Sequence, residues 1–399
     1  MKRLLQVTFG IWLLILATIP LKAAYSSLYV FGDALSATAD PQSSGPPYYY
    51  QQRWSNGRVW AEVLAQRQGI KFDNAKNSSY WDHNSTLLAN ELNSFNPPPD
   101  VATSLFVVWV CNADTFDATS SVMWSKVNTP SALLNVFTSA NAQAQNNNLQ
   151  IILNLYAKGV RTLIMPNAVD ISEIPAFNQG KWSSVLQAGC VDYNNRLAAT
   201  INQASSLCPG LTIYSPDFYT LLNNVLANPG YYGLTNALSG NYSIDAYSDP
   251  SIVNLTLNGQ GANYIFWDPQ DPTAQFHEVI ADVAQQIISP VSIGKLTVGN
   301  GINRLDLANV PVGLNGIVEG SPNWALGGWT TVTNFASTGL AQSVFINAPP
   351  LPPSTPASGT GGNGSIDPNN PNNQGNTYIA PTNSAQYYRL HFPFSWSWP

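Results

Sequence analysis

Short apolar segments separated by helical patterns constrain the fold more than any other feature of this sequence. The segments SSLYVF at 26–31, TSLFVVWVC at 103–111 and RTLIMP at 161–166 consist mainly of β-branched, aromatic and other apolar residues. Such runs are typical of strands buried on both faces of a parallel sheet. Helical periodicity at 131–158 and 182–204 predicts crossover helices. We therefore expect an α/β fold, a three-layer α/β/α sandwich with a parallel central sheet.

The first apolar segment stops abruptly at Gly32-Asp33. Glycine permits a tight turn, and an aspartate can hydrogen-bond to nearby backbone amides. The next side chain, Ala34, is then presented at the carboxyl end of a strand, where open α/β sheets bind their ligands. We expect two further short strands, at 70–74 and 211–214.

The N-terminus has the composition of a targeting segment. Lys2 and Arg3 precede an apolar run at 4–20 and a pair of alanines, which predicts a secretory signal peptide over 1–24. The alternative is an uncleaved membrane anchor, for which the run is short. We therefore expect an exported protein, periplasmic, cell-surface or extracellular, with no membrane span in the mature chain.

The charge balance excludes one class of partner. The chain has 16 basic and 22 acidic residues, a net charge of -6, and only 10% of its residues are charged. A nucleic-acid-binding protein needs a basic surface that displaces counterions, and no such run of basic residues occurs. No nucleic-acid partner is expected.

Three cysteines are too few for a disulfide scaffold. Cys190 and Cys208 form a disulfide or remain two buried free thiols, and the sequence leaves both alternatives open. No residue spacing suggests a metal or a cofactor.

The character of the chain changes near residue 288. We assign 25–288 to the α/β domain and 289–399 to a small β-rich module, because helical periodicity gives way to short alternating segments between Gly, Asn and Pro turns. A Pro/Gly/Asn/Ser-rich stretch at 349–384 is predicted to be a disordered insertion in this module. In the first domain, the polar run NAQAQNNN leaves two alternatives open, one helix over 131–158 or two shorter helices.

Three motifs occur in a fixed order: FGDAL at 31–35, RWSNG at 53–57 and FWDPQDPT at 266–273. Together they resemble the GDSL (SGNH) family of ester hydrolases and lipases. The resemblance covers about 26–288 and implies an SGNH-hydrolase fold. It also implies hydrolysis of carboxylic esters through an acyl-serine, with a histidine base oriented by an aspartate and an oxyanion hole.

The chain departs from that pattern at two catalytic positions. The nucleophilic serine is replaced by Ala34, and the histidine by Asp271, whereas the aspartate is present as Asp268. Gly32 and Asp33 match the family as supporting residues. A methyl group cannot attack an acyl carbon, and a carboxylate is a poor substitute for an imidazole base.

The oxyanion hole is also altered according to the resemblance. Ser78 is assigned to the position of a family glycine, although the register is uncertain, and Ala113 to that of the family asparagine. Asp114 matches the following family aspartate. Asn112 stands one position early; it either reaches the pocket through a local shift or is a turn residue after the strand.

His277 is a candidate replacement base, but a helix histidine satisfied by packing and by backbone hydrogen bonds is the simpler interpretation. Three functional hypotheses follow, in this order. The first is an exported pseudoenzyme that binds a small ester, lipid or glycan. The second is an active ester hydrolase with an unrecognised nucleophile. The third is a structural envelope protein.

Overall fold

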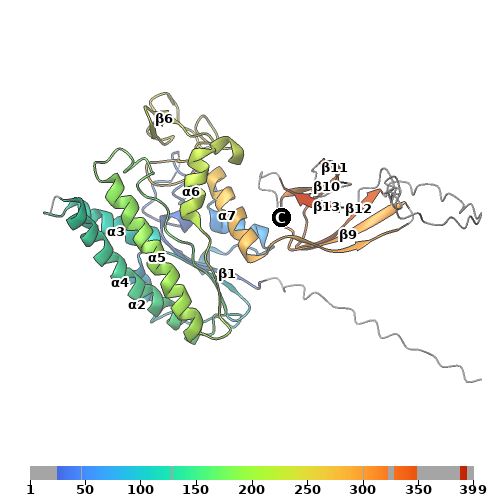
Figure 1. Ribbon diagram of the computed structural model, residues 1–399, viewed down its shortest axis with the longest axis horizontal. Helices are drawn as coiled ribbons and strands as arrows, with labels where there is room; N and C mark the ends of the chain where they lie inside the picture. The colour runs from blue at the N-terminus through green and yellow to red at the C-terminus, as the bar shows by residue number, and fades with distance from the viewer. Residues whose placement is uncertain are drawn as a thin grey trace, which may run out of the picture.

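The computed structural model describes residues 25–45, 47–126, 129–299, 301–321, 328–347 and 387–392. The predicted signal peptide and the predicted insertion at 349–384 lie outside these residues. Two hydrophobic clusters of buried side chains are present, one in the larger part of the molecule on the left of Figure 1 and one in the β-rich part on the right.

The larger part contains a five-stranded sheet in the order β2-β1-β3-β4-β5. All its neighbouring strands run parallel, as the apolar runs predicted. Since β1 has β2 on one side and β3 on the other, the direction of the connections reverses there, and the crevice at the carboxyl ends of β1 and β3 is the expected ligand site. The strands are β1 (Leu28–Gly32), β2 (Asn77–Ser79), β3 (Leu105–Trp109), β4 (Thr162–Ile164) and β5 (Thr212–Tyr214).

Helices cover both faces of the sheet, which confirms the predicted three-layer sandwich (Figure 1). On one face, Trp60 meets Trp109 of the sheet edge-on at 5.3 Å and Phe218 at 6.1 Å between ring centroids. This face carries α1 (Trp60–Arg67), α6 (Phe218–Ala227) and α7 (Ala274–Ile288). The other carries α2 (Ser85–Glu91), α3 (Cys111–Met123), α4 (Pro130–Ala157) and α5 (Ser183–Leu207).

The strand predicted at 70–74 is wrong. Asp73 accepts a hydrogen bond from the backbone N–H of Ala75 and so begins a 3-10 turn, η2 (Asn74–Lys76). The chain joins the sheet only after this turn, in β2. A local side-chain cap therefore shifts the strand toward the C-terminus.

The polar run in the long helix does not divide it, because α4 continues from Pro130 to Ala157. Asn141 donates to the backbone oxygen of Gly189 at 2.9 Å, and Asn148 donates to the Tyr193 hydroxyl at 3.0 Å. The buried asparagines are thus bound to α5, so the run is a polar interface between two helices.

The open question of the cysteines is answered by the structure. Cys111, Cys190 and Cys208 are all buried free thiols. Burial raises the pKa of Cys190 to about 12, which keeps it protonated and unreactive at neutral pH.

The β-rich part consists of two three-stranded sheets, β11-β10-β13 and β12-β9-β8, around their own small cluster of buried residues. Its strands pair antiparallel. They are β8 (Ser292–Thr297), β9 (Ile302–Ala308), β10 (Asn315–Ser321), β11 (Thr330–Ala336), β12 (Ala341–Asn347) and β13 (Tyr387–His391). A separate hairpin, β6 (Leu238–Ser239) and β7 (Tyr242–Ser243), lies in the long loop after α6 and the turn η3 (Pro229–Tyr232).

The C-terminal end of α1 joins the two parts. The backbone N–H of Val312 donates to the backbone oxygen of Arg67 at 3.1 Å. The Arg67 guanidinium in turn binds Asp282 of α7 at 2.7 Å, with both side chains almost fully buried. One arginine therefore ties α1 to α7 and places the β-rich part beside them.

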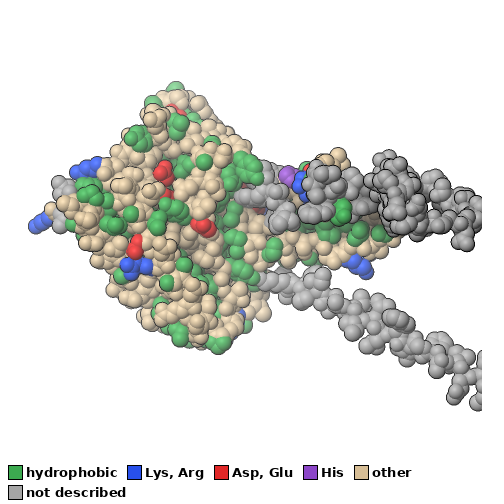
Figure 2. All heavy atoms as spheres, in the orientation of Figure 1, with side chains coloured by type: hydrophobic (Ala, Val, Ile, Leu, Met, Phe, Trp, Pro, Cys, Tyr) green, Lys and Arg blue, Asp and Glu red, His purple; other side chains and the backbone are tan. Residues whose placement is uncertain are grey.

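Charged side chains are sparse and scattered on the face seen in Figure 2, in keeping with the low charge content. Within the described ranges, none of the helices combines the length and the hydropathy that crossing a bilayer requires.

Candidate functional site

The loop after β1 presents Ala34 at the carboxyl end of the sheet. The backbone N–H of Asp33 donates to the oxygen of Trp109 at 3.1 Å, which joins the ends of β1 and β3. The Asp33 carboxylate then accepts a hydrogen bond from the backbone N–H of Leu35 and caps the short helix η1 (Ala34–Ser36). The predicted corner is therefore present, and Ala34 lies at the expected switch point.

Gly32 makes this corner possible. A Cβ atom at position 32 would lie 2.6 Å from Cβ of Ser36 and 3.0 Å from Oγ of Ser79. Distances this short force the backbone to move. Gly32 supports the site by letting the corner close, and it is not among the residues that line the cavity.

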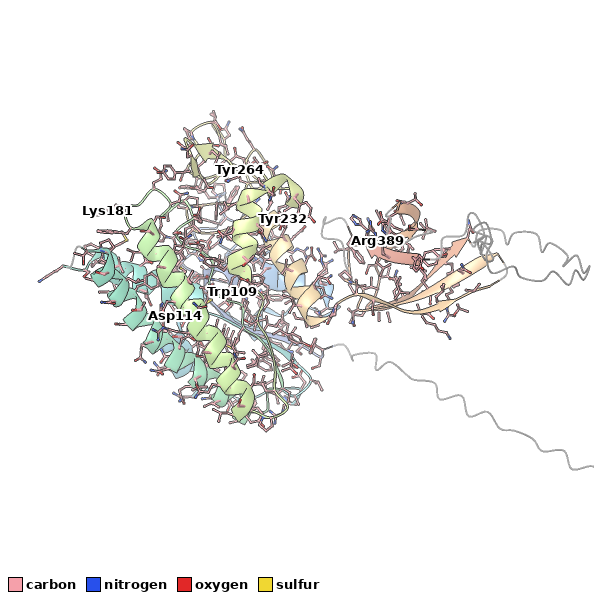
Figure 3. All side chains as sticks on the ribbon, in the orientation of Figure 1. Trp109, Asp114, Lys181, Tyr232, Tyr264 and Arg389 are labelled. Carbon is pink, nitrogen blue, oxygen red and sulfur yellow. The ribbon has the colours of Figure 1, made fainter. Side chains whose placement is uncertain are left out.

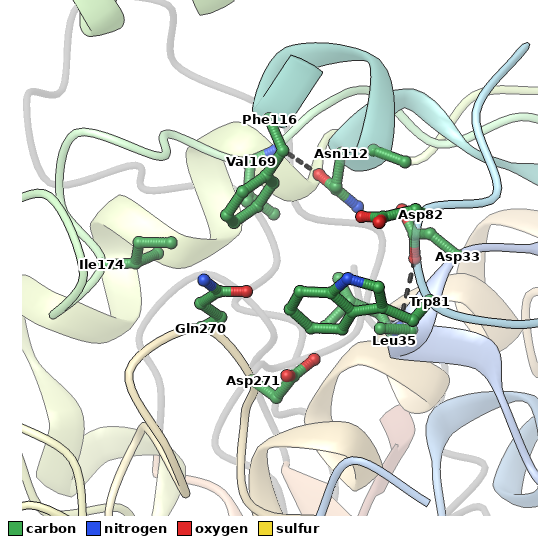
Figure 4. A pocket seen from close by; sticks show the side chains of 12 residues that line it. Asp33, Leu35, Trp81, Asp82, Asn112, Phe116, Val169, Ile174, Gln270 and Asp271 are labelled. Atoms are coloured by element: carbon green, nitrogen blue, oxygen red, sulfur yellow. Dashed lines mark hydrogen bonds between the residues drawn. The ribbon is translucent and has the colours of Figure 1, made fainter. Parts of the chain in front are cut away.

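The end of β3 supplies the second side of the site, and it is the start of a helix. α3 begins at Cys111, so Asn112 and Ala113 lie in its first turn and both face the cavity. The turn expected at Asn112 is therefore wrong, and the alternative that brings Asn112 into the pocket is supported. Asn112 Oδ1 accepts from the backbone N–H of Val169 at 3.1 Å, whereas its Nδ2 is buried without a hydrogen bond of good geometry (Figure 4).

Asp114 lies behind the site, in the helical layer (Figure 3). Its carboxylate accepts hydrogen bonds from the backbone and side chain of Ser85 and from the Tyr193 hydroxyl at 2.7 Å. Burial raises its pKa to about 6. Asp114 thus connects α2, α3 and α5 and holds the start of α3 in place.

The third side comes from the loop that precedes α7. Asp268 accepts hydrogen bonds from the backbone N–H groups of Gln270 and Asp271 and from the Tyr49 hydroxyl, all between 2.8 and 2.9 Å. Asp271 reaches the cavity, and its Oδ2 is buried without a partner. Asp268 is therefore satisfied behind the cavity wall, while Asp271 faces the ligand space.

Burial governs the charge of these carboxyl groups. It raises the pKa of Asp33 to about 7, although the Leu35 N–H and the nearby Asn112 amide oppose the shift. It raises the pKa of Asp268 to about 6. The pKa of Asp271 rises well above its usual range because of burial first and then because of the neighbouring charges of Asp268 and Asp33. Burial and the neighbouring charges thus favour the neutral form of Asp271, which can donate a hydrogen bond.

These three loops enclose a cavity of ≈ 40 Å³. This space accommodates about three water-sized groups. Figure 4 shows Asn112, Gln270 and Asp271 with their polar ends around it. The lining residues are Asp33, Ala34, Leu35, Trp81, Asp82, Asn112, Ala113, Phe116, Val169, Ile174, Gln270 and Asp271.

Ser78, in contrast, is not among the lining residues. It pairs with Phe31 inside the sheet, and the loop after β2 brings Trp81 and Asp82 to the cavity instead. Asp82 has φ = 61°, a conformation that glycine adopts most readily. Neither residue could be singled out from the sequence, because no local pattern indicates which residue of a loop turns toward a distant strand.

The chain has three histidines, and none lines the cavity. His277 is fully buried in α7 with both ring nitrogens unpartnered, and burial lowers its pKa to about 3. His83 stacks on Tyr80, and its Nδ1 lies 3.0 Å from the backbone oxygen of Gly32. His391 belongs to β13 in the β-rich part. His277 is packed inside α7, as the simpler interpretation predicted, but the backbone hydrogen bonds that this interpretation included are wrong, because neither ring nitrogen has a partner.

The family model described as GDSL-like lipase/acylhydrolase matches residues 28–284. The chain belongs to this family. The matched range begins at the first residue of β1, ends inside α7 and contains every residue that lines the cavity. The predicted family is thereby confirmed.

Two GDSL esterase/lipases of Arabidopsis thaliana are similar to this chain. One is 28% identical over 162 residues and the other 24% over 153 residues. In each case the alignment covers 36% of this chain and 41% of the relative, so the chain matches less than half of the length of these proteins.

Several solved structures are similar at low identity. They include a lipase from a goat rumen metagenome, with a TM-score of 0.41, 11% identity and coverage of 66% of this chain and 97% of that one. The extracellular lipase of Streptomyces rimosus has a TM-score of 0.40 and 13% identity, with coverage of 66% and 99%. An acetylxylan esterase of Geobacillus stearothermophilus has a TM-score of 0.38 and 12% identity, with coverage of 67% and 96%.

Proposed function

We propose that this member of the GDSL family binds a small ester in the cavity beside Ala34 and does not hydrolyse it by the family mechanism. One observation carries the proposal. None of the twelve residues that line the cavity is a Ser, Thr, Cys, Lys, His or Tyr. An acyl-enzyme mechanism needs a hydroxyl, thiol or amine nucleophile and commonly an imidazole base.

Carboxylates are the remaining groups that act as nucleophiles in enzymes. Asp271 is a poor candidate because its raised pKa favours the neutral carboxyl group, which is a much weaker nucleophile than a carboxylate. Asp33 accepts a hydrogen bond from the N–H of Leu35, and burial raises its pKa to about 7, so about half of this group is in the neutral, weakly nucleophilic form at that pH. These constraints favour binding over an alternative covalent route.

The polar atoms of the cavity suit an ester carbonyl. Asn112 and Asp271 both line this space: Asp271 Oδ2 is buried without a partner, and Asn112 Nδ2 lies near Asp33 without a hydrogen bond of good geometry, so each can offer a donor to a ligand. A carbonyl oxygen accepts from both, which removes the cost of leaving these donors unsatisfied in the interior. A free carboxylate would meet Asp33 and be repelled once that group ionises. A neutral ester is therefore preferred over its acid product.

The size of the cavity limits the acyl group. With space for about three water-sized groups, it accommodates an acetyl group and little more. The alcohol part of such an ester must lie outside, toward the exposed residue Asp82 at the rim.

The decisive experiment compares hydrolysis of p-nitrophenyl acetate by the natural chain and by the double variant Ala34→Ser/Asp271→His. We expect the natural chain to match its heat-denatured control. We expect the double variant to exceed it, because the serine and the imidazole then face each other across the cavity. Turnover by the natural chain above the denatured control would refute the proposal and support an active hydrolase with another nucleophile.

Ligand binding is measured separately by thermal unfolding with triacetin as a neutral ester and with acetate as an anion. A ligand that binds only the folded state raises the unfolding temperature. We expect a rise with triacetin and a smaller one with acetate, and no rise with either in Ala34→Leu, whose larger side chain fills the cavity. Absence of any rise in the natural chain would support a purely structural role.

We further propose that the protein acts outside the cytoplasm, on the basis of the predicted signal peptide. Intact-mass analysis of the protein recovered from an expressing cell tests this. A chain that begins near Tyr25 supports export, and a chain that retains Lys2 and Arg3 contradicts it.

A further inference from the structure

Two tryptophans from distant loops lie together at the edge of the cavity. The ring centroids of Trp54 and Trp81 are 4.9 Å apart and their planes are tilted by 46°. We call these two residues the tryptophan pair. Tyr49 continues the row, with its ring edge-on to Trp54 at 5.4 Å. Trp81 also lines the cavity (Figure 4), so the row of rings begins at the cavity wall.

A single buried carboxylate holds the tryptophan pair in position. Asp40 is 1% exposed, and its Oδ2 accepts hydrogen bonds from Nε1 of Trp54 at 2.9 Å and from the backbone N–H of Trp81 at 2.7 Å. Tyr49 is fixed independently through its hydroxyl on Asp268. The rings are therefore ordered before a ligand arrives, which reduces the entropy cost of binding.

The tryptophan pair differs from the tryptophans of the core. Trp60, Trp109 and Trp267 are fully buried. Trp54 and Trp81 are only partly covered, although a buried charged group is used to orient them. Packing alone does not require rings that remain partly exposed beside a cavity, whereas a ligand that packs on them does.

We propose that the tryptophan pair binds a sugar ring of a neutral carbohydrate whose ester group enters the cavity. This inference rests on the proposed function and names the alcohol part of the ligand. The apolar face of a sugar ring packs on an indole face, and the polar edge of the sugar stays in water. Asp82 and Gln270, which line the cavity, are in position to accept or donate hydrogen bonds to hydroxyl groups.

Two observations favour a neutral sugar over the other ligands. Asp33, Asp82 and Asp271 surround the cavity without a lysine or arginine among the lining residues, which disfavours an anionic sugar or a phosphate headgroup. A lipid chain needs a continuous apolar channel. The adjoining apolar cavity, behind Leu35 and Ile174, holds only ≈ 30 Å³, far below the roughly 300 Å³ of an ordinary ligand pocket.

Affinity electrophoresis tests the inference with native gels that contain acetylated xylan, acetylated glucomannan or hydroxyethyl cellulose. We expect the natural chain to be retarded in at least one gel. Trp54→Ala and Trp81→Ala should weaken the interaction about tenfold, the loss expected when one stacking contact is removed. Trp81→Phe, which keeps a ring, should retain part of it.

Trp124→Ala is the matched control, because Trp124 is 87% exposed at the end of α3, away from the tryptophan pair. It should be retarded like the natural chain. Circular dichroism and the unfolding temperature establish that each variant is folded. The inference is overturned if no gel retards the natural chain, if retardation survives both alanine substitutions in folded variants, or if Trp124→Ala abolishes it.

The thermal shift with triacetin separates the two proposals. Trp54 does not line the cavity, so Trp54→Ala should keep the shift while losing retardation. A triacetin shift without retardation of the natural chain in any gel refutes the carbohydrate inference alone. Absence of both refutes the proposed function as well.

Discussion

The backbone N–H of Asp271 donates to Oδ1 of Asp268 over 2.8 Å, and this turn holds two buried carboxyl groups side by side. The charge of Asp268 raises the pKa of Asp271 in addition to the effect of burial, whereas burial is the main cause of the raised pKa of Asp268. Protonated Asp271 is the form that the fold stabilises, so this pair makes stability dependent on pH.

Asp271→Asn should change how the free energy of unfolding varies with pH. A carboxyl group whose pKa is higher in the folded state than in the unfolded chain contributes stability below pH 4, and this contribution is lost as the pH rises through the folded-state pKa. The asparagine variant has no such loss. We expect the two proteins to be similar in stability near pH 4.

At pH 8, Asp271→Asn should be the more stable protein by at least about 1 kcal/mol, the equivalent of less than one pKa unit. Urea unfolding at pH 4.5, 6 and 8 measures the difference. Asp306→Asn, on the exposed face of β9, is the control for a general effect of charge removal. A difference that stays constant with pH for Asp271→Asn would contradict the assignment.

His277→Leu should stabilise the protein, because both ring nitrogens of His277 are buried without partners. Removal of unsatisfied buried polar groups is worth roughly 1–3 kcal/mol. The gain should grow below pH 6.5. There the unfolded chain binds a proton at this histidine, while the folded protein does not until about pH 3.

Urea unfolding at pH 5 and pH 8 distinguishes this effect from a change in packing. We expect the gain at pH 5 to exceed that at pH 8 by about 2 kcal/mol. The same substitution at His391, which is only partly buried in β13, should give no comparable gain. Equal gains at the two pH values would mean that the ring nitrogens do titrate in the folded protein.

Gly32→Ala should destabilise the protein by about 1–3 kcal/mol, because its methyl group would lie 2.6 Å from Cβ of Ser36. It should also abolish the triacetin shift, since the corner that presents Ala34 must move. Gly230→Ala is the matched control, because nothing lies within 4 Å of the added atom. That variant should stay within about 0.5 kcal/mol of the natural chain. A stable Gly32→Ala protein with an unchanged triacetin shift would disprove the role of this glycine.

Asp282→Asn should destabilise the protein by about 3 kcal/mol or more, because Arg67 would remain as a buried charge without its partner. Arg196→Gln disrupts an exposed pair with Asp192 and should cost at most about 0.5 kcal/mol. Chemical denaturation compares the two. Similar losses in the free energy of unfolding for the two variants would show that the buried ion pair between Arg67 and Asp282 does not stabilise the protein more than an exposed pair.

Much of the scaffold follows from local patterns. The runs at 26–31 and 103–111 are continuous and apolar because both faces of a parallel sheet are covered. The apolar residues at 182–204 recur at helical spacing because one face of α5 is buried against the rest of the molecule. Where a side-chain hydrogen bond competes with the pattern, as Asp73 does before β2, prediction from the sequence placed the strand several residues too early.

The sequence by itself determined the family, because FGDAL, RWSNG and FWDPQDPT occur in the order that identifies it. Only the tertiary structure decided which side chains share the cavity. Asn112 faces the cavity at the start of α3, and Trp81 and Asp82 line it where Ser78 was expected. Asp40 joins Trp54 to Trp81. Contacts of this kind link residues that are far apart in the chain, and local periodicity carries no information about how distant loops meet.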